Sequence, residues 1–145
     1  VLMDRADKIA ILERYRPITR AVEELPEAIQ RAASAAEKVT VSFSETSGGG
    51  GDCHSRVEQQ VELKVLLEEE LRSKQRFLLA VMGAVLDLTD DYERLVLQYR
   101  YIGTRKLSTK ATAERLGYSE SSIKRCLTRA LDNLDLSSDL KVDPF

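Results

Sequence analysis

The sequence is poor in cysteine and proline and lacks tryptophan: its 145 residues include two Cys, three Pro and no Trp. Two cysteines are too few for a disulfide scaffold, so a reducing, cytoplasmic setting is expected. The longest apolar run, residues 77–86, is about half as long as the roughly 20 residues that span a membrane. No basic-then-apolar leader opens the chain, so we expect neither a secretory signal nor a membrane partner.

Histidine is also scarce, and the spacing of the few metal-binding residue types fits no metal site. The one histidine stands in the pair Cys53-His54, and the chain has no Cys-x-x-Cys motif. The glycines at 48–51 lack the following Lys-Ser/Thr of a phosphate-binding loop. No set of residues resembles a catalytic constellation. We therefore predict a protein that is not an enzyme and that uses no metal or other cofactor.

Apolar residues at helical spacing dominate the first part of the chain. Residues 5–39 and 57–87 place them three or four apart, and Pro17 and Pro26 suit the first turn of a helix, which predicts a kink or break at one or both. Gly83 is expected to allow a close approach between helices. The Ser/Gly-rich segment 44–55 predicts a flexible loop. We expect residues 1–87 to form a coiled-coil-like helical hairpin, within an all-α fold, that makes the protein a homo-oligomer.

Charge is segregated along the chain. Residues 94–129 carry nine basic and two acidic side chains, a net charge of +7 inside a chain whose net charge is −2. A compact basic block is typical of a surface that binds a polyanion, although a solvated basic surface would have the same composition. Residues 137–145 follow as an acidic tail.

Residues 88–136 predict a separate domain of three helices. Thr89, Ser108 and Ser119 are positioned to cap their N-termini, and Gly103 and Gly117 to end the first and second helices.

The second and third of these helices fit a helix-turn-helix. Ala113 is small where the helices cross, Gly117 accepts a positive φ in the turn, and Ile123 fills the junction. With Ile123 inward, a polar and basic face of the third helix points outward. Glu120 could read a base or could complement the helix N-terminus. The predicted base contacts are Glu120, Ser121, Ser122, Lys124 and Arg125, and the predicted phosphate contacts are Arg105, Lys106, Lys110 and Arg129.

Residues 88–101 (LTDDYERLVLQYRY) and 116–125 (LGYSESSIKR) resemble the fourth region of bacterial sigma factors. The whole chain is similar in layout to phage-encoded transcriptional regulators of the RinA and ArpU type. The resemblance implies a transcriptional regulator in the cytoplasm of a bacterial host, with double-stranded DNA and RNA polymerase as partners. Thr112 departs from the sigma pattern, which has a bulky apolar residue there, and Lys110 stands where an acid is common.

Two other functions remain open from the sequence. A terminase small subunit also joins a helix-turn-helix to an oligomerising helical segment. A helical adaptor could instead use the basic face to bind an acidic protein such as RNA polymerase, without DNA.

Overall fold

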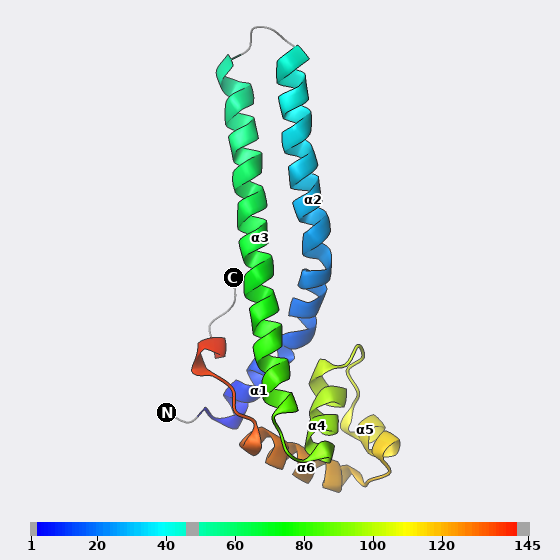
Figure 1. Ribbon diagram of the computed structural model, residues 1–145. Coiled ribbons are helices and arrows are strands. Elements are labelled where there is room, and N and C mark those ends of the chain that lie inside the picture. Colours follow the sequence, from blue (N-terminus) through cyan, green and yellow to red (C-terminus); the bar gives the residue numbers. More distant parts are fainter. Residues whose placement is uncertain (1–2, 46–49, 142–145) are drawn as a thin grey trace. The chain divides into compact units, whose positions relative to one another are not determined.

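The computed structural model describes residues 3–45 and 50–141, with side chains for 3–38 and 55–141. All regular structure in these ranges is helical (Figure 1), which confirms the predicted all-α fold. The described residues divide into two compact units, one within residues 3–19 and 76–141 and the other within residues 20–75. Residues at both ends of the predicted hairpin thus group with the helix-turn-helix.

Three helices form the N-terminal part: α1 (Arg5–Glu13), α2 (Tyr15–Glu45) and α3 (Gly50–Leu86). Asp4 caps α1, since its carboxylate accepts a hydrogen bond from the backbone N–H of Asp7 at 2.8 Å. The break predicted near Pro17 is confirmed, because α1 ends before Arg14 and Pro17 lies in the first turn of α2. Pro26 lies inside α2 and does not end it.

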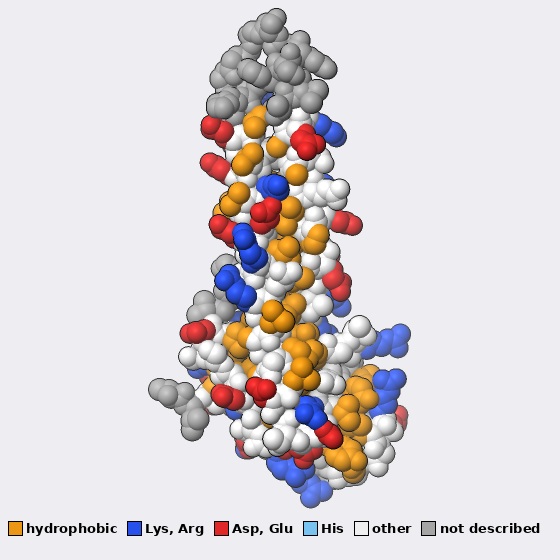
Figure 2. All heavy atoms as spheres, in the orientation of Figure 1, with side chains coloured by type: hydrophobic (Ala, Val, Ile, Leu, Met, Phe, Trp, Pro, Cys, Tyr) orange, Lys and Arg blue, Asp and Glu red, His pale blue; other side chains and the backbone are white. Residues whose placement is uncertain are grey.

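In the second unit, α2 and α3 lie side by side (Figure 1). Leu25 and Ala32 are buried, and Figure 2 shows apolar side chains interspersed with charged ones along the two helices. Helix covers more of the predicted loop 44–55 than expected, since α2 reaches Glu45 and α3 starts at Gly50. Each residue added to a formed helix gains a backbone hydrogen bond, which favours this extension. Residues 46–49 lie outside the described ranges.

The first unit joins α1 to the C-terminal helices. Its most deeply buried side chains come from both ends of the chain, and Ile11, Val85, Val96 and Leu134 are each at most 1% exposed. Polar contacts add to this packing: the Lys8 ammonium donates to the Leu131 carbonyl at 2.6 Å.

The C-terminal segment is also tied to α1. Within the predicted acidic tail, residues Ser138–Lys141 form a short 3-10 helix, η2. Arg14 donates to the carbonyls of Leu140 and Lys141, both at 3.2 Å, and the Lys141 ammonium lies 2.9 Å from the Asp7 carboxylate. These contacts hold η2 against the N-terminal helix.

Candidate nucleic-acid interface

The helix that precedes the helix-turn-helix is α4 (Asp91–Leu97), and its cap is Asp90 instead of the predicted Thr89. The Asp90 carboxylate accepts hydrogen bonds from the backbone N–H groups of Tyr92 at 2.8 Å and Glu93 at 3.3 Å. A carboxylate also interacts more favourably than a neutral hydroxyl with the positive end of the helix dipole. The helix continues as a π-helical turn, η1 (Gln98–Ile102), and stops at Gly103 as predicted.

The predicted helix-turn-helix is formed by α5 (Thr109–Leu116) and α6 (Glu120–Asn133). Ser108 caps α5, accepting from the Ala111 N–H at 3.1 Å, and Ser119 caps α6 in the same way. Gly117 ends α5 with φ of 75°, the left-handed conformation that glycine adopts most readily. The positions of both caps and of the turn are therefore confirmed.

A small apolar cluster fixes the angle between the helices. Ile123 is 1% exposed and packs with Val96, Ala113 and Cys126. Burial raises the pKa of the Cys126 thiol. Thr112, which departs from the sigma pattern, is fully buried, and its hydroxyl donates to the Ser108 carbonyl at 2.8 Å. The polar atom is satisfied inside the α5 turn, so its burial leaves no unpaired hydroxyl.

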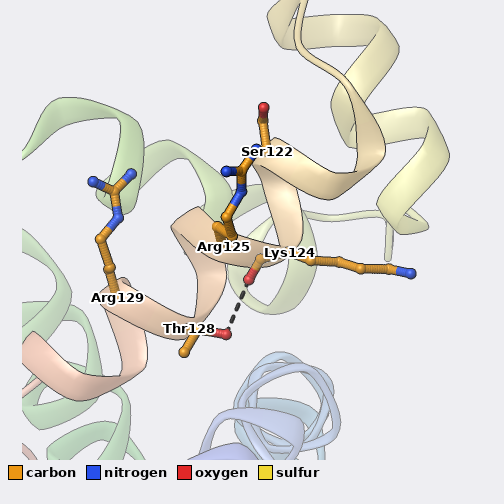
Figure 3. A pocket seen from close by; sticks show the side chains of 5 residues that line it. All are labelled: Ser122, Lys124, Arg125, Thr128 and Arg129. Atoms are coloured by element: carbon orange, nitrogen blue, oxygen red, sulfur yellow. Dashed lines mark hydrogen bonds between the residues drawn. The ribbon is translucent and has the colours of Figure 1, made fainter.

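The side of α6 opposite Ile123 is polar, basic and exposed, as the helical spacing predicts. Arg125 and Arg129 extend to the same side of α6, whereas Lys124 extends in another direction (Figure 3). An open hollow of about 610 Å³ lies along this face, and it is lined by Ser122, Lys124, Arg125, Thr128 and Arg129. The structure thus brings four of the predicted contact residues together with Thr128, which was not among the predicted contacts.

The serines at the start of α6 are tied to its cap. The Ser119 hydroxyl donates to the Ser122 hydroxyl at 2.9 Å and lies 3.2 Å from the Ser121 hydroxyl. Ser122 is also half-buried. The side chains of Lys124 and Arg125 are longer than those of the serines, and both are exposed.

Three predicted phosphate contacts lie on a different part of the domain. Arg105 and Lys106 are exposed in the segment between η1 and α5, and Lys110 is exposed in the first turn of α5. None of the three lines the hollow on α6. Glu120, at the first position of α6, is exposed and does not line it either.

Arg16, in the first turn of α2, holds the segment that carries Arg105. Its guanidinium donates to the backbone carbonyls of Gly103 at 2.7 Å, Arg100 at 3.1 Å and Arg105 at 2.9 Å. These carbonyls belong to the end of η1 and the following turn, where no helical N–H is available to them. Sequence reasoning missed this role, because nothing in the local pattern links Arg16 to residues that far along the chain.

Most of the basic block is not neutralised by nearby acids. In the described part of the chain, Arg94 is the member of the block that forms an ion pair, with Asp91. The Arg115 guanidinium lies 5.7 Å from the centre of the Tyr99 ring, a cation–π contact that leaves its charge in place. The domain therefore presents a positive surface to a polyanion.

The described residues contain neither a candidate metal site nor a candidate membrane-spanning helix. Their His, Cys, Asp and Glu side chains form no group of three or more that could hold a metal ion, and the side chains of Cys53 and His54 lie outside the described set. Among the described residues, no helix is both long enough and apolar enough to cross a membrane.

Comparison with known proteins gives a family match for the C-terminal part of the chain. Residues 85–135, from the end of α3 to just past α6, match the protein family described as Sigma-70, region 4. Neither the curated proteins nor the solved structures gave a match. Residues 85–135 therefore form a helix-turn-helix domain similar to region 4 of sigma-70 factors, a type of domain that binds DNA and carries out no catalysis.

Proposed function

We propose that this protein is a sequence-specific DNA-binding transcriptional regulator that acts at promoters. The observation that carries the proposal is the exposed basic face of α6, set in a domain similar to region 4 of sigma-70 factors. A helix of this kind enters the major groove, where each base pair presents a distinct pattern of donors and acceptors.

The contacts follow from reach and chemistry. Arg125 lies one turn into α6 and can donate two hydrogen bonds to a guanine, with Lys124 beside it. Ser121, Ser122 and Glu120 lie nearer the helix start, where a base edge would come close to the cap. The four remaining contacts, to phosphates, come from Arg129, Arg105, Lys106 and Lys110.

The wider setting rests on the resemblance to phage regulators. The protein would be encoded by a phage or prophage, act in the cytoplasm of the bacterial host and meet RNA polymerase at the promoter. Its N-terminal helices would make it a homo-oligomer, so that two linked α6 helices bind two half-sites on one duplex.

The first test is selection of binding sites from a random duplex pool with the full-length protein. Arg125→Ala should weaken binding to the selected site by about 1–3 kcal/mol and relax preference at one or two base pairs. Arg129→Ala should instead weaken binding to all duplexes and lower the salt dependence by about one phosphate contact.

Arg31→Ala provides a matched control, because it removes the same charge from an exposed position on α2, where Arg31 pairs with Glu27. It should leave sequence preference unchanged. If no sequence is enriched and random duplex is not bound, the DNA-binding function is wrong, and an adaptor that binds an acidic protein becomes the better explanation.

A further inference from the structure

An apolar stripe lies exposed on the last three turns of α3, in the same compact unit as the helix-turn-helix. Leu79 is 72% exposed and Leu86 is 55% exposed. Gly83 lies between them, four residues after the first and three before the second, so all three share one side of the helix. Exposed leucines are common singly, but an aligned set on a helix is typical of a surface that packs against another helix.

The space beside Gly83, at the centre of this stripe, is open in the described part of the chain. A Cβ atom placed on Gly83 would have no heavy atom within 4 Å. The close helix approach that the sequence predicts at Gly83 is therefore not made within the described chain. A glycine at the centre of an apolar stripe leaves room for the backbone of a second helix from another molecule.

The charges at the two ends of the stripe indicate which molecule that is. Arg76 lies one turn before Leu79 and Asp87 directly follows Leu86, and both are exposed. The stripe thus runs from a positive end through an apolar centre to a negative end. Two such stripes are complementary when they run in opposite directions, because each Arg76 then faces an Asp87. In a parallel pair, like charges would meet, which is unfavourable.

We infer that the stripe of Arg76, Leu79, Gly83, Leu86 and Asp87 binds a second copy of this chain, with the two α3 helices antiparallel around a two-fold axis close to Gly83. This inference specifies the contact in the proposed homo-oligomer and does not depend on DNA binding. A two-fold contact uses the same patch on both molecules, as this stripe requires. Since a single helix pair buries less than the standard interface of about 1,200–2,000 Å², the dimer should be weak and dependent on concentration.

Sedimentation of the full-length protein at several concentrations tests the apolar centre. Leu79→Glu combined with Leu86→Glu should raise the dissociation constant of the dimer at least about tenfold. The matched control is Leu66→Glu, at a leucine that is 61% exposed on α3 but lies in the other compact unit. It should leave the dissociation constant unchanged, and circular dichroism should show equal helix content in all variants.

Charge reversal tests the antiparallel arrangement. Arg76→Asp and Asp87→Arg should each weaken the dimer, because each places like charges together at both ends of the contact. The double variant should restore association, because both pairs are then complementary again. If both single variants weaken the dimer and the double variant does not recover, the antiparallel arrangement is wrong.

Cross-linking tests the position of the axis. In a Cys53→Ser background, Gly83→Cys should form a disulfide-linked dimer on mild oxidation, because the two Gly83 positions would lie near each other. Glu114→Cys, at an exposed position on α5, serves as the control and should form no disulfide-linked dimer under the same conditions.

Two results would overturn the inference. A full-length protein that stays monomeric at all concentrations would reject both the stripe contact and the proposed homo-oligomer. A protein that associates equally well with Leu79→Glu and Leu86→Glu would place the contact elsewhere and reject the stripe alone. In either case, site selection from random duplex still decides the proposed DNA-binding function separately.

Discussion

The substitutions Gly117→Ala and Gly83→Ala should change the stability of the first compact unit, which contains the helix-turn-helix, in opposite directions. A Cβ atom at either position would meet no heavy atom within 4 Å, so neither substitution causes a clash. The difference lies in the backbone. Gly117 has φ of 75° and ψ of 30°, whereas Gly83 lies in the regular helix α3.

The magnitudes follow from these conformations. The left-handed conformation costs an L-residue about 1–2 kcal/mol, and the lower entropy of the unfolded Ala chain returns about 0.4–1 kcal/mol. Gly117→Ala should therefore lower the free energy of unfolding by about 0.5–1 kcal/mol. Gly83→Ala should raise it by roughly the same amount, about 0.5–1 kcal/mol, because alanine is favoured over glycine inside a helix.

Tyrosine fluorescence during urea unfolding measures this unit selectively. The chain has five tyrosines and no tryptophan, and all five lie in the first unit: Tyr15, Tyr92, Tyr99, Tyr101 and Tyr118. Protein concentrations low enough to keep the chain monomeric separate folding from self-association.

Gly117→Asn is the matched control, since asparagine tolerates the left-handed conformation better than alanine does. Its loss of stability should be smaller than that of Gly117→Ala. If Gly117→Ala proves neutral or stabilising, the turn does not require a positive φ and the reasoning that places Gly117 in it is wrong.

Three further measurements test the core and the ion pairs. Ile123→Ala should lower the free energy of unfolding by about 2–5 kcal/mol in the same assay, while Ile123→Val should cost only about 0.5–1.5 kcal/mol. In a Cys53→Ser background, the Cys126 thiol should react slowly with a thiol reagent in the folded protein and quickly in urea, because it is buried and its pKa is raised; fast labelling of the folded protein would contradict its burial. The hydrogen bond from Arg5 lowers the pKa of Asp132 below its ordinary value of 3.8, so this carboxylate adds stability above that pH and loses it as the pH falls through the lowered value. Asp132→Asn should therefore make the acid loss of stability shallower in urea titrations across pH 2–5, and identical pH profiles would show that the pair contributes nothing.

The sequence by itself determined the helix-turn-helix, because its signals are local. Ser108 and Ser119 supply side-chain acceptors for N–H groups three residues later, and both caps form where the sequence places them. Gly117 supplies the positive φ and Ile123 the buried apolar side chain. Each of these features depends on residues within one or two turns, so the pattern of residue types was enough. Helical spacing likewise predicted which side of α6 is exposed.

At two places the sequence offers two residues that could each cap or break a helix, and the backbone geometry determines which one does so. Thr89 and Asp90 both have cap-forming side chains, and Asp90 became the cap because its carboxylate reaches two N–H groups at the start of α4. Pro17 and Pro26 both suit a first helical turn, yet the break lies beside Pro17 alone. Leu25, next to Pro26, is buried, and this packing helps α2 continue through the proline at the cost of one backbone hydrogen bond.

Only the tertiary structure decided which parts of the chain belong together. Arg5 binds Asp132 across 127 residues, and Arg16 binds the carbonyl of Arg100 across 84. These contacts place α1 with the helix-turn-helix, although the sequence assigned residues 5–39 to the hairpin, with a kink or break at one or both prolines. The spacing of apolar residues shows which side of a helix is buried. It does not show which other helix packs against that side, since any helix with an apolar stripe of similar width could do so. The partner of α1 therefore depends on shape and hydrogen-bond geometry that form only once distant segments meet.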